Sequence, residues 1–269
     1  MGQRAGLERA RELYQRTEYQ AALDALDGIT EKSAELFLLR GKCQFMRGEF
    51  KKSSDALEQA VHLAPDDSQT QLWLGRAYGR RAETSSFLTA PGLAGKARDR
   101  FARAVALDQD NKDAVGDLFE YYMEAPGFLG GGVDKAAALA EKFKNSDAAE
   151  YHYRLAQLAS KRKDLKTTEE QLRLAMGAAP GQVGRIIDLA QFLASQRRYQ
   201  ESDALFVQAE KAAPASAKLL FERARAYIDA GRSLDKAREM LARYLKSPLT
   251  PDDPPRREAE QLLKRAGAG

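Results

Sequence analysis

The chain has 269 residues, of which 43% are hydrophobic and 30% are charged. This hydrophobic fraction excludes a disordered chain, and no stretch approaches the apolar run of about 20 residues that a membrane span requires, so no membrane insertion is expected. The 43 basic and 39 acidic residues give a net charge of +4 but are intermixed along the chain. Such mixing is typical of solvated helix faces and argues against nucleic acid as the partner.

The amino-terminal segment MGQRAGLERARELY begins helical patterning at once and contains no hydrophobic core of a signal peptide. As it stands, the sequence fits a cytoplasmic protein. It fits a periplasmic protein if a signal peptide has been removed upstream of this segment.

Several residue types recur at intervals of 34 positions. The same step separates Gly41 from Gly75, Pro180 from Pro214, and the successive alanines Ala156, Ala190 and Ala224. A fixed period of this length is the signature of stacked structural repeats.

The repeat is clearest over residues 34–67. Apolar residues at helical spacing are interrupted by Gly48, and a second helical stripe follows and ends before Pro65. Each unit is therefore expected to be an antiparallel pair of helices. Gly41 and Ala60 are expected to permit close helix approach, since larger residues there would overpack and cost roughly 1–3 kcal/mol.

The order of these residues resembles the tetratricopeptide repeat, whose signature runs from Leu-Gly through Tyr, Ala and Phe to Ala and Pro. One unit reads Leu189, Ala190, Tyr199, Phe206, Ala209 and Pro214, and another reads Leu74, Gly75, Tyr78 and, after an insertion, Ala97, Phe101 and Ala104. The resemblance implies an all-α, right-handed solenoid in a single domain over residues 1–269. We expect seven helix pairs and a capping helix, over residues 3–33, 34–67, 68–111, 112–148, 149–182, 183–216, 217–251 and 252–266.

Two consecutive units carry insertions between their helices. The first insertion follows Tyr78 and the second follows Tyr122, and both contain an Ala-Pro-Gly sequence with apolar neighbours. Ordinary turns are polar, so we expect the two loops to pack together as a lobe that binds a partner. Its candidate residues are Phe87, Leu88, Leu93, Phe128 and Leu129. The alternative is that each loop folds back on its own helix pair.

No catalytic chemistry is expected. The glycine-rich segment 127–132 lacks the Lys and Ser or Thr of a phosphate-binding loop. His62 and His152 have no second ligand at metal-binding spacing, and Cys43 is expected to be a small buried residue. The sequence therefore predicts no enzyme activity, no metal site and no cofactor.

The resemblance also implies that the first helix of each unit lines a concave groove that binds a peptide or protein. Carried over position by position, the candidate groove residues are Arg11, Tyr14, Lys42, Phe45, Arg76, Glu120, Tyr153, Gln157, Gln191, Phe221 and Arg225. Amides, cations and aromatic rings of this kind suit an extended peptide. Chaperone-binding relatives hold a terminal carboxylate with Lys, Asn and Arg, and the lack of Asn beside Arg11 and Lys42 argues against that clamp.

The predicted function is a non-enzymatic scaffold, bacterial in style, that engages a protein or peptide at the groove or at the lobe. The alternative is an accessory subunit of a cell-envelope or multi-enzyme assembly, exported from the cytoplasm.

Overall fold

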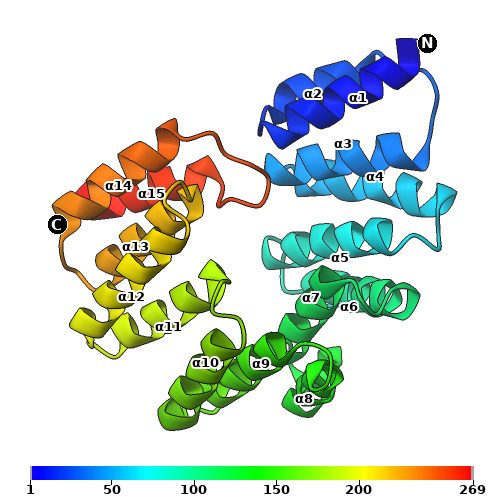
Figure 1. The fold of residues 1–269 in the computed structure, drawn as a ribbon. Helices are drawn as coiled ribbons and strands as arrows, with labels where there is room; N and C mark the ends of the chain where they lie inside the picture. Colours follow the sequence, from blue (N-terminus) through cyan, green and yellow to red (C-terminus); the bar gives the residue numbers. More distant parts are fainter. Residues whose placement is uncertain (1, 268–269) are drawn as a thin grey trace. The chain divides into compact units, whose positions relative to one another are not determined.

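The computed structural model describes residues 2–267, and over this range the chain is all α-helical, as predicted, without a β-strand (Figure 1). Seven helix pairs follow one another, and each predicted unit contains one pair. The helices are α1 (Gly2–Gln15), α2 (Tyr19–Asp27), α3 (Ala34–Met46), α4 (Phe50–Leu63), α5 (Ser68–Glu83), α6 (Ala90–Leu107), α7 (Lys112–Glu124), α8 (Val133–Ala140), α9 (Ala148–Lys161), α10 (Leu165–Ala178), α11 (Val183–Ser195), α12 (Tyr199–Ala212), α13 (Ala217–Asp229), α14 (Leu234–Lys246) and α15 (Arg256–Gly267).

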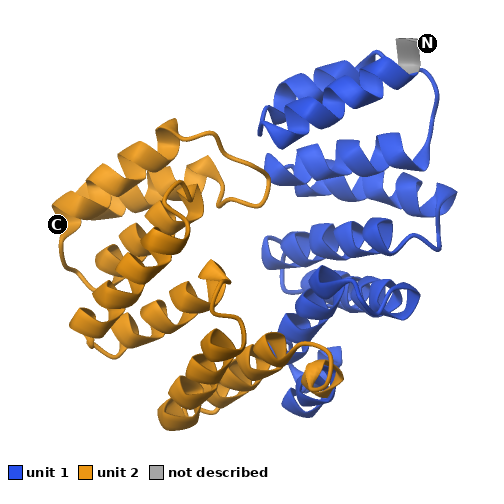
Figure 2. Cartoon of the chain, viewed as in Figure 1, with its two compact units in different colours: residues 1–139 blue, residues 140–269 orange. Residues whose placement is uncertain are grey.

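The helices group into two compact units, residues 1–139 and residues 140–269, which we call unit 1 and unit 2 (Figure 2). Within the units the two helices of six pairs pack on one another, with α7 and α8 as the exception, and consecutive pairs pack in order along the chain. That the whole chain forms a single continuous solenoid stays a prediction.

Five of the pairs turn from the first helix to the second in the same way. The residue two positions beyond the end of the first helix has a left-handed backbone, and the next N–H donates to the carbonyl five residues earlier, at 2.9–3.0 Å. This hydrogen bond satisfies a carbonyl that the helix end would otherwise leave without a partner. The left-handed residues are Thr17, Gly48, Lys163, Arg197 and Gly231.

The predicted close helix approach at Gly41 is confirmed, and Gly75 shows the same feature. A Cβ added to Gly41 would lie 2.4 Å from Cγ of Leu57, and one added to Gly75 would lie 2.6 Å from the ring of Phe101. The nearest neighbour of Gly41 is thus Leu57, one turn before the buried Ala60.

The first insertion is mostly helix rather than loop. It lengthens α5 to 16 residues and α6 to 18 residues, which leaves only a short connection between Glu83 and Ala90. The second insertion contains a 3-10 turn, η1 (Gly127–Leu129), and two glycines with positive φ, Gly130 and Gly132. Gly131 lies so close to the main chain that a Cβ would stand 1.8 Å from the carbonyl oxygen of Ala125.

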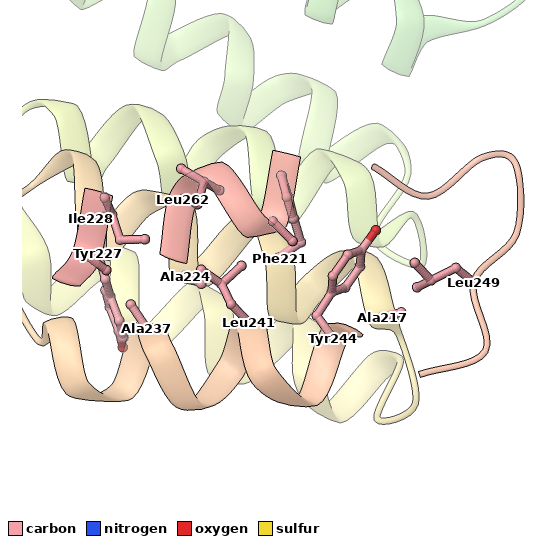
Figure 3. Packing of buried hydrophobic residues seen from close by; sticks show 12 residues of the cluster. Ala217, Phe221, Ala224, Tyr227, Ile228, Ala237, Leu241, Tyr244, Leu249 and Leu262 are labelled. Atoms are coloured by element: carbon pink, nitrogen blue, oxygen red, sulfur yellow. The ribbon is translucent and has the colours of Figure 1, made fainter. Parts of the chain in front are cut away.

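The last helix, α15, packs against the final helix pair. It buries Ala259, Leu262 and Ala266 in a cluster with Phe221 of α13 and Tyr244 of α14 (Figure 3). The helix begins at Arg256 rather than at residue 252, because prolines occupy positions 254 and 255 and cannot continue a helical hydrogen-bond ladder.

Candidate partner-binding surfaces

In unit 1, three of the predicted groove residues contact Trp73, the only tryptophan in the sequence, and a fourth, Tyr14, contacts one of these three. The Nζ atom of Lys42 is 5.0 Å from the centroid of the Trp73 ring and 6.0 Å from that of Tyr14. Cζ of Arg76 is 4.9 Å from the Trp73 ring, and the Phe45 ring meets it edge-on at 5.4 Å. We call Tyr14, Lys42, Phe45, Trp73 and Arg76 the first-helix face of unit 1, because they come from α1, α3 and α5.

Two carboxylates of α7 hold the guanidinium of Arg76 in place. Its Nε lies 2.5 Å from Oδ2 of Asp117, and its Nη2 lies 3.4 Å from Oδ2 of Asp113. Burial alone would lower the pKa of Arg76, but these two carboxylates raise it above its usual value. Arg76 therefore stays charged and holds one orientation over Trp73.

The predicted groove residues of unit 1 differ in their exposure to solvent and therefore in their accessibility to a partner. Tyr14 is only 7% exposed and its ring lies 5.6 Å from that of Tyr19, whereas Lys42 and Phe45 are half-buried. Arg11 is half-buried and pairs with Glu8 and Glu35. Glu120 is exposed on α7.

In unit 2, two predicted groove residues, Gln191 and Arg225, line a pocket of about 970 Å³. The pocket lies where α11 and α13 end and α12 begins, and small side chains there leave the space. We call it the unit 2 pocket, and its lining consists of Gln191, Ala194, Ser195, Arg197, Tyr199, Arg225, Ala226, Asp229 and Ala230.

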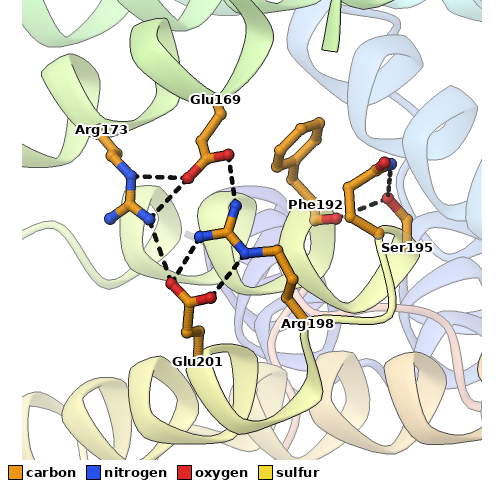
Figure 4. A network of polar contacts seen from close by, with 7 residues as sticks. Glu169, Arg173, Phe192, Ser195, Arg198 and Glu201 are labelled. Carbon is orange, nitrogen blue, oxygen red and sulfur yellow. Dashed lines mark hydrogen bonds and ion pairs between the residues drawn. The ribbon is translucent and has the colours of Figure 1, made fainter. Parts of the chain in front are cut away.

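The turn beside this pocket is held by a charged network (Figure 4). Arg198 donates to Glu169 at 2.5 Å and to both carboxylate oxygens of Glu201 at 2.6 and 2.7 Å. Arg173 contacts the same two glutamates. The network joins α10 to α12 and fixes the backbone that precedes Tyr199.

Residues Tyr153 and Gln157 of α9 take part in another polar cluster of unit 2. The Tyr153 ring lies 4.0 Å from Cζ of Arg185, and Gln157 accepts a hydrogen bond from Arg154 at 3.0 Å. Arg185 also pairs with Asp188 at 3.1 Å. Burial raises the pKa of Asp188 to about 6, although Arg185 acts to lower it.

The structure does not favour Phe221 as a groove residue. It is 1% exposed, and its ring packs on Tyr244 at 5.3 Å between centroids. Position 221 faces the second helix of its own pair, so a bulky ring there fills the core. Phe221 is therefore excluded from the proposed binding surfaces.

The predicted lobe residues are exposed to different degrees. Phe87, Leu88 and Phe128 are 83%, 77% and 82% exposed, while Leu93 and Leu129 are half-buried. The carbonyl of Leu129 accepts hydrogen bonds from Tyr121 of its own helix pair at 2.8 Å and from Arg98 of the preceding pair at 3.2 Å. The second insertion is therefore tied to α6, and the joint lobe stays a prediction.

Cys43 and His152, which were weighed as catalytic candidates, are each engaged within the fold. Cys43 is fully buried, and burial raises its pKa to about 12. Nδ1 of His152 lies 2.8 Å from Oε1 of Gln171. Over residues 2–267 no three metal-ligating side chains come together, and no helix combines the length and apolarity needed to cross a bilayer.

Sequence reasoning missed Trp73 and Arg197. Trp73 precedes Arg76 by three positions on a predicted first helix, and residues at this spacing lie on the same helix face. The contact between Trp73 and Arg76 could therefore have been predicted from the sequence. Arg197 had no such signal in the sequence, because its position in the pocket depends on α13, which follows some 20 residues later.

The family model of the tetratricopeptide repeat matches residues 7–68 and 187–254. A comparison with curated proteins finds no match. Among solved structures, a tetratricopeptide-repeat protein from Parabacteroides merdae aligns with a TM-score of 0.61 at 12% identity, covering 99% of both chains. One from Thermus thermophilus aligns with a TM-score of 0.56 at 19% identity, covering 71% of this chain and 98% of its own.

A third similar structure is the APC/C hetero-tetramer Cut9-Hcn1, with a TM-score of 0.52 at 14% identity over 96% of this chain and 48% of the other. At these identities the structures show a common fold. With the family model matching near both ends of the sequence and a helix pair in every unit between them, the chain belongs to the tetratricopeptide-repeat family.

Proposed function

We propose that the chain is a non-catalytic scaffold that binds a protein partner through an extended segment on the first-helix face of unit 1. The observation that carries this proposal is the half-buried Trp73 ring, whose centroid lies 5.0 Å from Nζ of Lys42 and 4.9 Å from Cζ of Arg76. Tryptophan and arginine are the residues that most often dominate binding energy at protein interfaces.

A protein ligand suits this face better than a nucleic acid. Nucleic-acid binding requires a surplus of unopposed cations along a surface. Here Arg76 is opposed by Asp117 and Asp113, and Arg11 is opposed by Glu8 and Glu35. The face therefore offers aromatic contact area with mixed charges, as an interface for a peptide does.

A pull-down with purified variants tests the location. Lys42→Glu reverses a charge beside Trp73, and Phe128→Ser removes an exposed ring of the predicted lobe. Lys32→Glu, at an exposed site before α3, is the charge-matched control. We expect Lys42→Glu alone to lose a partner that the parent chain retains. Retention of every partner by Lys42→Glu would contradict the assignment, and loss with Phe128→Ser alone would move the site to the lobe.

The absence of catalysis is part of the same proposal. Turnover of a partner by the purified chain, abolished by a substitution on the first-helix face, would refute it.

A further inference from the structure

The unit 2 pocket contains one positive charge that the fold leaves unopposed. Arg225 pairs with Glu222 at 2.5 Å, and Asp229 pairs with Arg265 at 2.8 Å. Arg197 also lines the pocket, but it forms no ion pair or hydrogen bond through its side chain with any part of residues 2–267 that the structure describes.

The lack of a charged partner is not general to this turn, as the neighbouring Arg198 shows. Arg198 is bound to two glutamates in the network of Figure 4. Arg197 is exposed, and its backbone has φ of 61°, a conformation that favours glycine. Gly48 and Gly231 occupy the equivalent position in two other helix pairs. Thr17 and Lys163 occupy it in two more, so the turn does not require an arginine, and the case for the Arg197 side chain rests on its place in the pocket lining.

Two further polar groups on the pocket wall are available to a ligand. The hydroxyl of Tyr199 makes no hydrogen bond among residues 2–267, and Cζ of Arg232 lies 4.6 Å from the centroid of the ring. Gln191 donates through Nε2 to Glu222 at 2.6 Å, which leaves its carbonyl oxygen to accept a hydrogen bond. A hydroxyl and an amide can bind the main chain of an extended segment.

We infer that the unit 2 pocket binds an extended segment of a protein partner by placing an aspartate or glutamate carboxylate of that segment against Arg197. A guanidinium matches a carboxylate in shape and can donate two parallel hydrogen bonds to it. The single negative charge of the carboxylate also matches the single positive charge of Arg197. A phosphate, with nearly two negative charges, would exceed the one unopposed cation and would lie in the same pocket as Asp229.

The size of the pocket agrees with a peptide ligand. A volume of about 970 Å³ accommodates several side chains and lies at the upper end of ligand pockets, which span roughly 300–1,000 Å³. The inference rests on the proposed function only in taking a protein segment as the ligand, since the pocket shares no residue with the first-helix face of unit 1.

The test uses a random library of 12-residue peptides with acetylated amino termini and amidated carboxyl termini. The library is selected against the full chain, and the dissociation constants of enriched peptides are measured by calorimetry. The diagnostic variant is Arg197→Gly. Its matched control is Lys163→Gly, because Lys163 is also an exposed cation with a left-handed backbone, φ of 60°, two positions after a first helix, but lies outside the pocket.

We expect enriched peptides to share an Asp or Glu, and Arg197→Gly to weaken their binding at least tenfold while Lys163→Gly leaves it unchanged. Exchanging the shared acid for its amide should weaken binding by the same factor. Both variants place glycine at a left-handed position that glycine adopts readily, so neither is expected to destabilise the fold. Lower affinity in Arg197→Gly alone would therefore not be explained by unfolding.

Three results would overturn the inference: no acidic residue among the enriched peptides, equal affinity for Arg197→Gly and parent, or binding only when a phosphoserine or a free carboxyl terminus replaces the acidic side chain. Loss of binding with Lys42→Glu but not with Arg197→Gly would refute the pocket and leave the first-helix face standing. The reverse pattern would refute the face and support the pocket.

Discussion

Gly75 in α5 faces the ring of Phe101 in α6 so closely that a Cβ on residue 75 would lie 2.6 Å from two ring carbons. Gly79, one turn later in the same helix, has no atom within 4 Å of the corresponding position. We expect Gly75→Ala to lower the free energy of unfolding by roughly 1–3 kcal/mol through overpacking. Gly79→Ala should raise it by about 0.5–1 kcal/mol, because alanine is the better helix former.

Urea denaturation of the two variants checks this pair. Equal effects of the two alanines would show that the helices of this pair do not touch at Gly75.

Lys163 adopts a left-handed backbone at the position where other helix pairs have Gly48 and Gly231. A side chain in that conformation costs roughly 1–2 kcal/mol, part of which is offset by the greater freedom of glycine in the unfolded chain. We therefore expect Lys163→Gly to raise the melting temperature and Gly48→Ala to lower it. Calorimetry measures both, and a lower melting temperature for Lys163→Gly would refute the left-handed turn.

Asp188 should make stability depend on pH. Burial among Arg185, Lys218 and Glu222 raises its pKa to about 6, while an aspartate in the unfolded chain has the usual pKa of 3.8. Between these two values the folded chain keeps a proton that the unfolded chain has lost, so the free energy of unfolding falls as pH rises. We expect Asp188→Asn to flatten this fall between about pH 4 and pH 6.

Denaturation curves across that range measure the slope for both chains. Identical slopes would show that Asp188 ionises normally.

Asp117 holds Arg76 against Trp73, and both partners of this ion pair are 23% exposed. Asp117→Asn should lower the free energy of unfolding by about 1–3 kcal/mol, because it weakens a hydrogen bond to a charged group. It should also alter the emission of Trp73. Asp113→Asn is the control, since Asp113 is 68% exposed and 3.4 Å from Arg76, and a surface pair contributes about 0–1 kcal/mol. Unchanged emission in Asp117→Asn would contradict the positioning role.

The helix pairs and their turns could be predicted because a 34-residue period in apolar and small residues determines which helix faces pack. The contact at Gly41 was predictable for the same reason, as was the break at Gly48. The start of α15 was predicted too early, because acidic residues before Pro254 resemble the beginning of a helix.

The binding surfaces were less accessible to sequence reasoning. Lys42 and Arg76 were found because the repeat places them on first helices, whereas Trp73 was not singled out. Phe221 was assigned to the surface because apolar residues on a first helix can face either a ligand or the second helix, and spacing does not separate these faces. The unit 2 pocket depends on side chains from two successive repeats, a relationship that no single repeat contains.

The most direct measurement of the central claim is the emission of Trp73 during titration with a purified partner segment that the parent chain binds. Because the sequence has one tryptophan, a segment without tryptophan leaves the signal to this residue alone. The account predicts a saturable change in emission whose midpoint moves to higher concentration in Lys42→Glu but not in Lys32→Glu. Binding by calorimetry with constant Trp73 emission and equal affinity for Lys42→Glu would contradict it.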